Sequence, residues 1–136
     1  MQMARCKVIL LSLLLCLIAV ASASAHASGK SDYLADCARC HAVDGKGRVP
    51  EMREVKGYMS VDLTQLSKAN GGQFPRQAVY DAIDGRKRFP LHFVGDMPAW
   101  GVQYQEKDQE LTAEGREKVK RRIAALVGYI ESLQEK

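Results

Sequence analysis

Apolar residues near the C-terminus recur at spacings of three and four, which is the period of an amphipathic helix. The helix is expected to begin near Thr112, and its apolar positions are Val119, Ile123, Leu126, Val127, Ile130 and Leu133. Gly128 and Tyr129 interrupt the flank of this stripe, where a glycine would let another helix approach closely. The intervening basic residues are expected to face solvent, and they are Lys118, Lys120, Arg121 and Arg122. The pattern predicts a long C-terminal helix with one buried face.

Shorter helices are predicted upstream. Residues 31–41 form the first, with Ser31 or Asp32 as N-cap and with Tyr33 and Leu34 each sharing a face with Cys37. The second begins after Asp62 and ends at Asn70 and Gly71. The third runs from about Pro75 to Asp84, stops at Gly85, and has Val79 and Ile83 on its inner side.

The chain contains no clear alternating strand, no internal repeat and no low-complexity segment. We therefore predict an all-α fold. The last helix is expected to cross the first near Gly29 and Tyr33, since a glycine there permits close approach.

The first residues have the layout of a secretory signal peptide. Arg5 and Lys7 precede an apolar run over residues 8–20, and alternating alanines follow up to Ala25. We predict cleavage after Ala25, with Ala23 and Ala27 as competing sites and an uncleaved anchor as the less favoured alternative. Residues 1–25 would then be removed, and residues 26–136 would form one small domain outside the cytoplasm, in the periplasm, without stable membrane insertion.

Cleavage changes the composition. Cys6 and Cys16 leave with the signal peptide, so two cysteines remain. Loss of Arg5 and Lys7 lowers the formal net charge from +4 to +2, and the basic residues are scattered. This balance gives no reason to expect a nucleic-acid partner.

The two remaining cysteines stand in the stretch CARCH, with Cys37, Cys40 and His41 in the C-x-x-C-H spacing. A redox disulfide usually accompanies a strand–helix unit, which the pattern does not show. A structural zinc site needs a fourth ligand, which His26 or His92 would have to supply. Covalent haem attachment explains every residue, because both sulfurs lie one helical turn apart and the histidine follows to meet the iron.

A ligand for the opposite face of the iron is sought among Met52, Met59, Met97, His92 and His26. Met97 is favoured because Pro98 stiffens the chain directly after it. His92 and Met59 are the alternatives, and a methionine without such a role would be core filler. Trp100 either closes the pocket or is an ordinary core aromatic. Pro50 is a candidate to accept a hydrogen bond from the His41 ring through its carbonyl, or is a plain loop proline.

Together these motifs resemble the class I c-type cytochromes. The resemblance rests on CARCH, on the DMP around Met97 and on the closing LVGYIESLQ. More narrowly, DLTQLSKANGGQFP with DMPAWG is similar to bacterial exported single-haem cytochromes c, although KGYMSV stands where relatives often have a proline-rich stretch. The resemblance implies a helical domain wrapped around one haem c, attached by thioethers to Cys37 and Cys40 and ligated by His41 and Met97.

Iron held on both faces has no open position for substrate, so the expected function is one-electron transfer rather than enzymatic catalysis. The partners would be redox proteins of a respiratory chain, a dehydrogenase or quinol complex as donor and an oxidase or reductase as acceptor, docking transiently at the haem edge. Arg86, Lys87 and Arg88 either steer such a partner or form a solvated helix end. Two alternatives remain open: a five-coordinate haem protein that binds diatomic ligands or peroxide, and a haem subunit of a larger oxidoreductase.

Overall fold

The computed structural model describes residues 28–47, 60–86, 97–107 and 112–135. Within these ranges 71% of the residues are helical and none is in a strand, which confirms the prediction of an all-α structure. The predicted signal peptide, residues 1–25, lies outside the described residues.

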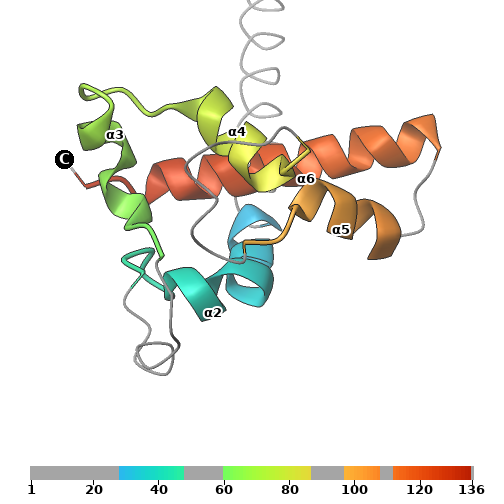
Figure 1. Cartoon of the computed structure of the whole chain (residues 1–136), viewed down its shortest axis with the longest axis horizontal. Helices are drawn as coiled ribbons and strands as arrows, with labels where there is room; N and C mark the ends of the chain where they lie inside the picture. Colours follow the sequence, from blue (N-terminus) through green and yellow to red (C-terminus); the bar gives the residue numbers. More distant parts are fainter. Residues whose placement is uncertain (1–27, 48–59, 87–96, 108–111, 136) are drawn as a thin grey trace, which may run out of the picture.

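The elements in chain order are η1 (Tyr33–Cys37), α2 (Ala38–His41), η3 (Leu63–Gln65), α3 (Leu66–Ala69), α4 (Arg76–Asp84), α5 (Trp100–Lys107) and α6 (Ala113–Ser132). Residues 28–32 are also helical and continue into η1, so one N-terminal helix runs through residues 28–41. Helix α6 spans the domain, with α4 and α5 packed along it and η3 near its C-terminal end (Figure 1).

The predicted apolar stripe of α6 forms most of the core. Val119, Ile123, Leu126, Val127 and Ile130 are buried, and Leu133 packs against them. The helix begins as predicted at Thr112, whose hydroxyl accepts a hydrogen bond from the N–H of Gly115 over 3.1 Å. From α4, Val79 and Ile83 are buried against this stripe, and α4 ends as predicted at Gly85, which adopts the left-handed conformation with φ +67°.

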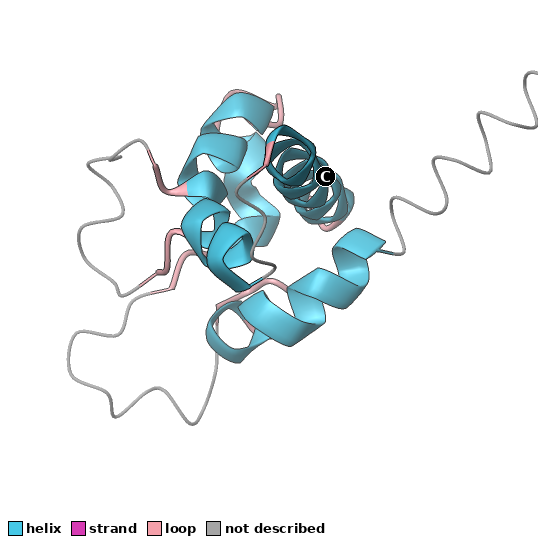
Figure 2. Cartoon of the chain, turned by 90° about the vertical axis from the view of Figure 1, so that its right-hand side faces the viewer, coloured by secondary structure: helices cyan, strands magenta, loops and turns pink. Residues whose placement is uncertain are grey.

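The N-terminal helix passes beside α6 (Figure 2). The two helices meet at Gly29, as expected. A Cβ at Gly29 would lie 2.6 Å from the carbonyl carbon of Ala125, so only glycine permits this approach. One turn later the rings of Tyr33 and Tyr129 pack at a centroid distance of 5.1 Å. The expectation for Gly128 is wrong, since no neighbouring atom lies within 4 Å of a Cβ built there.

Two charged residues have different roles from those predicted. Asp32 is not an N-cap, because its backbone is already helical and no cap hydrogen bond forms. Its carboxylate instead accepts a hydrogen bond of 2.8 Å from Arg122 of α6. Arg122 is therefore not on the solvent face: its side chain is only 23% exposed, and its guanidinium lies 3.7 Å above the centroid of the Tyr104 ring. Asp36 completes the cluster, accepting a 3.0 Å hydrogen bond from the Tyr104 hydroxyl.

Helix α5 was not anticipated from the sequence. Its single fully buried side chain is Tyr104, 1% exposed, and the Trp100 ring packs on it at 5.5 Å. Leu34 also departs from the prediction, because it is 45% exposed while Tyr33 and Cys37 are buried. No helix in the described part of the chain is long and apolar enough to cross a membrane.

The tight crossing predicts that Gly29→Ala lowers the free energy of unfolding by about 1–3 kcal/mol, the usual range for overpacking. Gly128→Ala is the matched control, because the added methyl meets no atom within 4 Å. It should raise the free energy by up to about 1 kcal/mol through helix propensity. Urea denaturation measures both values, and equal effects would contradict the close crossing.

The Arg122 cluster predicts that Arg122→Met lowers the free energy of unfolding by about 1–3 kcal/mol, because two half-buried carboxylates lose their cation. Arg121→Met changes the neighbouring, exposed arginine and should stay within about 0.5 kcal/mol of the wild type. Thermal unfolding of the two variants side by side makes the comparison. A loss of similar size in both would show that the cluster contributes no specific stabilisation.

Candidate functional site

The N-terminal helix carries Cys37, Cys40 and His41 at its end. Its η1 turn is π-helical, with the N–H of Ala38 bonded to the carbonyl of Tyr33 five residues back. Such single π turns are frequent at functional sites, because the extra residue changes the direction in which the following side chains point. Here it leaves Cys37 only 6% exposed in the core, while Cys40 and His41 are half-buried.

Cys37 and Cys40 do not form a disulfide with each other. Burial raises the pKa of the Cys37 thiol to about 12, and the charge of Asp36 adds to the effect. Redox exchange needs a thiolate, so this environment is the opposite of the one that activates a catalytic cysteine. Among the described residues, no three His, Cys, Asp or Glu side chains gather into a possible metal-binding group.

The His41 ring is oriented by a backbone carbonyl. Its Nδ1 lies 3.3 Å from the carbonyl oxygen of Val61, and the tautomer with the proton on Nδ1 donates there. A histidine held in this way coordinates a metal through Nε2, and the hydrogen bond raises the basicity of the ligand. Pro50, the candidate acceptor from the sequence, lies outside the described residues, and the observed acceptor is Val61.

Val61 is held in place by the loop that follows His41. The N–H of Gly47 donates to the carbonyl of His41 over 2.9 Å, and the N–H of Leu63 donates to the carbonyl of Gly45 over 2.8 Å. The Ser60 hydroxyl donates to the carbonyl of Gly47, also over 2.8 Å. The loop after His41 and the segment that carries Val61 are thus bonded to each other directly.

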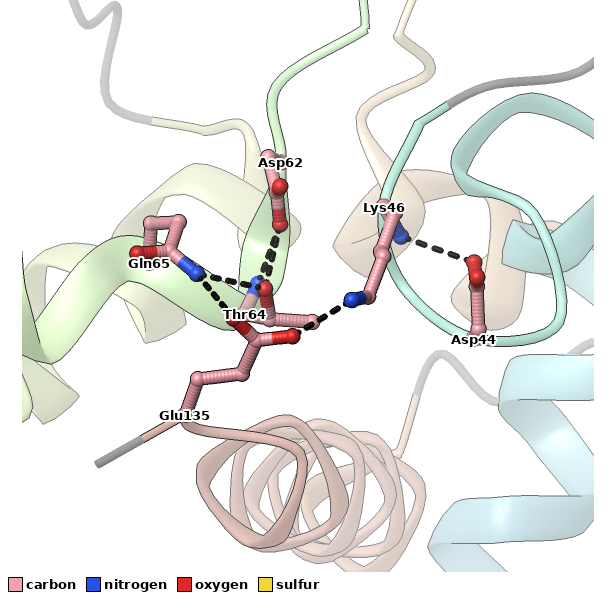
Figure 3. Close-up of polar contacts among 6 residues, drawn as sticks. All are labelled: Asp44, Lys46, Asp62, Thr64, Gln65 and Glu135. Carbon is pink, nitrogen blue, oxygen red and sulfur yellow. Dashed lines mark hydrogen bonds and ion pairs between the residues drawn. The ribbon is translucent and has the colours of Figure 1, made fainter.

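The residues that follow α6 bind both the loop after His41 and the segment that carries Val61 (Figure 3). The Glu135 carboxylate pairs with Lys46 of the loop and accepts a 2.7 Å hydrogen bond from Gln65. The backbone N–H of Glu135 donates to the carbonyl of Thr64 over 3.0 Å. Consistent with these contacts, the pKa of Glu135 is lowered, chiefly by its hydrogen bond with Lys46. The C-terminus therefore ties the loop after His41 to the segment that carries Val61.

Met97 lies just before α5, half-buried against the same core cluster that contains Cys37. The start of α5 is fixed to the end of α4, because a Cβ on Gly85 would lie 2.6 Å from the Ala99 Cβ. Arg86 strengthens this junction by donating to the carbonyl of Gly101 over 3.1 Å. Arg86 is thus engaged within the fold, whereas Lys87 and Arg88 lie outside the described residues.

The predicted residues divide into two groups. Cys37, Cys40 and His41 lie together at one helix end, and Met97, just before α5, packs against the core cluster that contains Cys37. The competing ligands lie outside the described residues, and they are Met52, Met59, His26 and His92. The Val61 carbonyl was missed, because a backbone acceptor leaves no mark in side-chain chemistry. Comparison with protein-family models, curated proteins and solved structures found no match.

The loop geometry predicts a specific sensitivity at Gly47. Gly47→Ala places a methyl 2.9 Å from the Ser60 carbonyl oxygen, beside Val61, at a φ of +67°. Gly71→Ala has nearly the same φ, +68°, but meets no atom within 4 Å, so it isolates the backbone strain of about 1–2 kcal/mol. We expect Gly47→Ala to lose a further ~1–3 kcal/mol of unfolding free energy. Urea denaturation of the pair giving equal losses would mean that the Gly47–Ser60 contact is unimportant.

Proposed function

We propose that this chain is an exported single-haem electron-transfer protein of the class I cytochrome c type. Cys37 and Cys40 would hold one haem c through two thioethers, and His41 and Met97 would ligate the iron. The bound haem would supply reversible one-electron oxidation and reduction. The observation that carries the proposal is the His41 ring, oriented by Val61 and preceded within about one helical turn by two cysteines that do not form a disulfide with each other.

The donor set suits this group. Two thiols at the spacing of one helical turn match attachment along one edge of a macrocycle, and an imidazole and a thioether are established haem ligands. The raised pKa of Cys37 speaks for a buried structural sulfur rather than an exchanging thiolate. Electron transfer also requires that ligands move little between oxidation states. The Val61 hydrogen bond restrains His41, and the α4–α5 junction restrains the chain beside Met97.

The proposed location and partners rest on the sequence. Cleavage after Ala25 and attachment outside the cytoplasm would place the protein in the periplasm, with redox proteins as transient partners. A donor dehydrogenase or quinol complex and an acceptor oxidase or reductase are the partner classes that this chemistry serves.

The role of Met97 is tested by optical spectroscopy of the mature protein, purified from a host that attaches haem c. We expect a low-spin ferric spectrum with the weak long-wavelength iron–thioether band, loss of that band in Met97→Ala, and no reaction of the wild type with carbon monoxide. Met52→Ala, Met59→Ala and His92→Ala are the controls and should retain the band. A high-spin wild type that binds carbon monoxide would overturn electron transfer and favour a five-coordinate ligand-binding site.

A further inference from the structure

The residue after His41 has a strained backbone. Ala42 adopts φ +61° and ψ +162°, in a region that is essentially restricted to glycine. Within the described ranges it is the only non-glycine residue with positive φ. Strain of this kind persists only where surrounding contacts impose it, and it concentrates at functional sites.

Two donors contact the carbonyl of Ala42, the Tyr33 hydroxyl and the N–H of Gly45, which lies at 3.3 Å. The Tyr33 side chain is 0% exposed, and its hydroxyl donates to the carbonyl of Ala42 over 2.7 Å. The same hydroxyl lies 3.5 Å from the carbonyl of His41. The ring itself is clamped in the core by Tyr129 at 5.1 Å. A rigid, buried donor therefore holds the peptide that leaves the helix at His41.

We propose that Tyr33 is a positioning residue for His41, acting through the strained Ala42. Its hydroxyl keeps the chain after His41 in a turn that the backbone would not adopt by itself, and so sets the imidazole against the Val61 carbonyl. This inference rests on the proposed function, because it concerns the ligand that His41 presents to the iron.

The consequence is a specific effect of the hydroxyl. A phenylalanine would fill the same core volume but would lose the hydrogen bond, so Ala42 would relax towards an ordinary conformation. The His41 carbonyl and ring would shift, and the Nδ1 contact with Val61 would weaken. A less basic histidine stabilises ferric iron less, so the reduction potential should rise.

The test compares Tyr33→Phe, Ala42→Gly and the double variant as mature haem-loaded proteins. Tyr33→Phe should raise the reduction potential in an equilibrium redox titration. When Tyr33→Phe is combined with Ala42→Gly, the shift should fall to less than half, because glycine retains the positive φ without strain. Tyr33→Phe should also lower the free energy of unfolding more in the Ala42→Gly protein than in the wild type. In the wild type, relaxation of the strained Ala42 backbone offsets part of the loss, whereas glycine has no such strain to release.

Tyr104→Phe is the control. It also removes a buried tyrosine hydroxyl, whose acceptor is Asp36 rather than the chain after His41. It should lower stability but shift the potential less than Tyr33→Phe does. Equal potential shifts by Tyr33→Phe in both backgrounds, or no shift at all, would overturn the inference.

Haem content separates the two proposals. A wild type with no covalent haem would refute the proposed function, and the unfolding measurements would still decide whether Tyr33 and Ala42 are coupled. A haem-loaded protein in which the two substitutions are additive would refute the positioning role alone.

Discussion

The contact on which the rest of the structure depends is the backbone-to-backbone crossing at Gly29. Because this residue has no side chain, the N-terminal helix lies directly on α6 at Ala125. The same helix continues to Cys37, Cys40 and His41, so the crossing sets where these donors emerge. Arg122 of α6 secures the helix beyond the crossing through Asp32. Glu135, which follows α6, pairs with Lys46 in the loop after His41. Helix α6 and the residues after it therefore contact both the helix that carries Cys37, Cys40 and His41 and the loop that follows His41.

Much of the fold follows from periodicity and end signals. The apolar stripe of α6, its Thr112 cap and the Gly85 stop of α4 are local features, and local features are readable along a chain. The prediction for Asp32 was wrong because its contact is not local. Aspartate is a common N-cap, but the partner of Asp32 is Arg122, which lies 90 residues away in the sequence. Helix α5 was not predicted because Tyr104 is its single fully buried side chain. One apolar position is not enough to show a helical period in the sequence.

The site divides in the same way. Its side-chain donors stand in a motif, so the sequence alone predicts roles for Cys37, Cys40 and His41, and these roles stay predictions, as does that of Met97. What orients the donors is backbone. The position of the Val61 carbonyl and the conformation of Ala42 depend on how residues 42–47 fold against residues 60–63. The identities of these two residues, a valine and an alanine, do not indicate those contacts in the sequence. Tyr33 is recognisable in the sequence as a packing residue, but its hydroxyl gains meaning only beside Ala42.

The central claim is that Cys37 and Cys40 together bind one haem covalently. The most direct measurement is the intact mass of the mature protein under denaturing conditions, after export in a host that attaches haem c and after treatment with a thiol-alkylating reagent. We expect the mass of the chain from residue 26 plus one haem, with no alkyl group added. The mass of the polypeptide alone, carrying two alkyl groups, would contradict it.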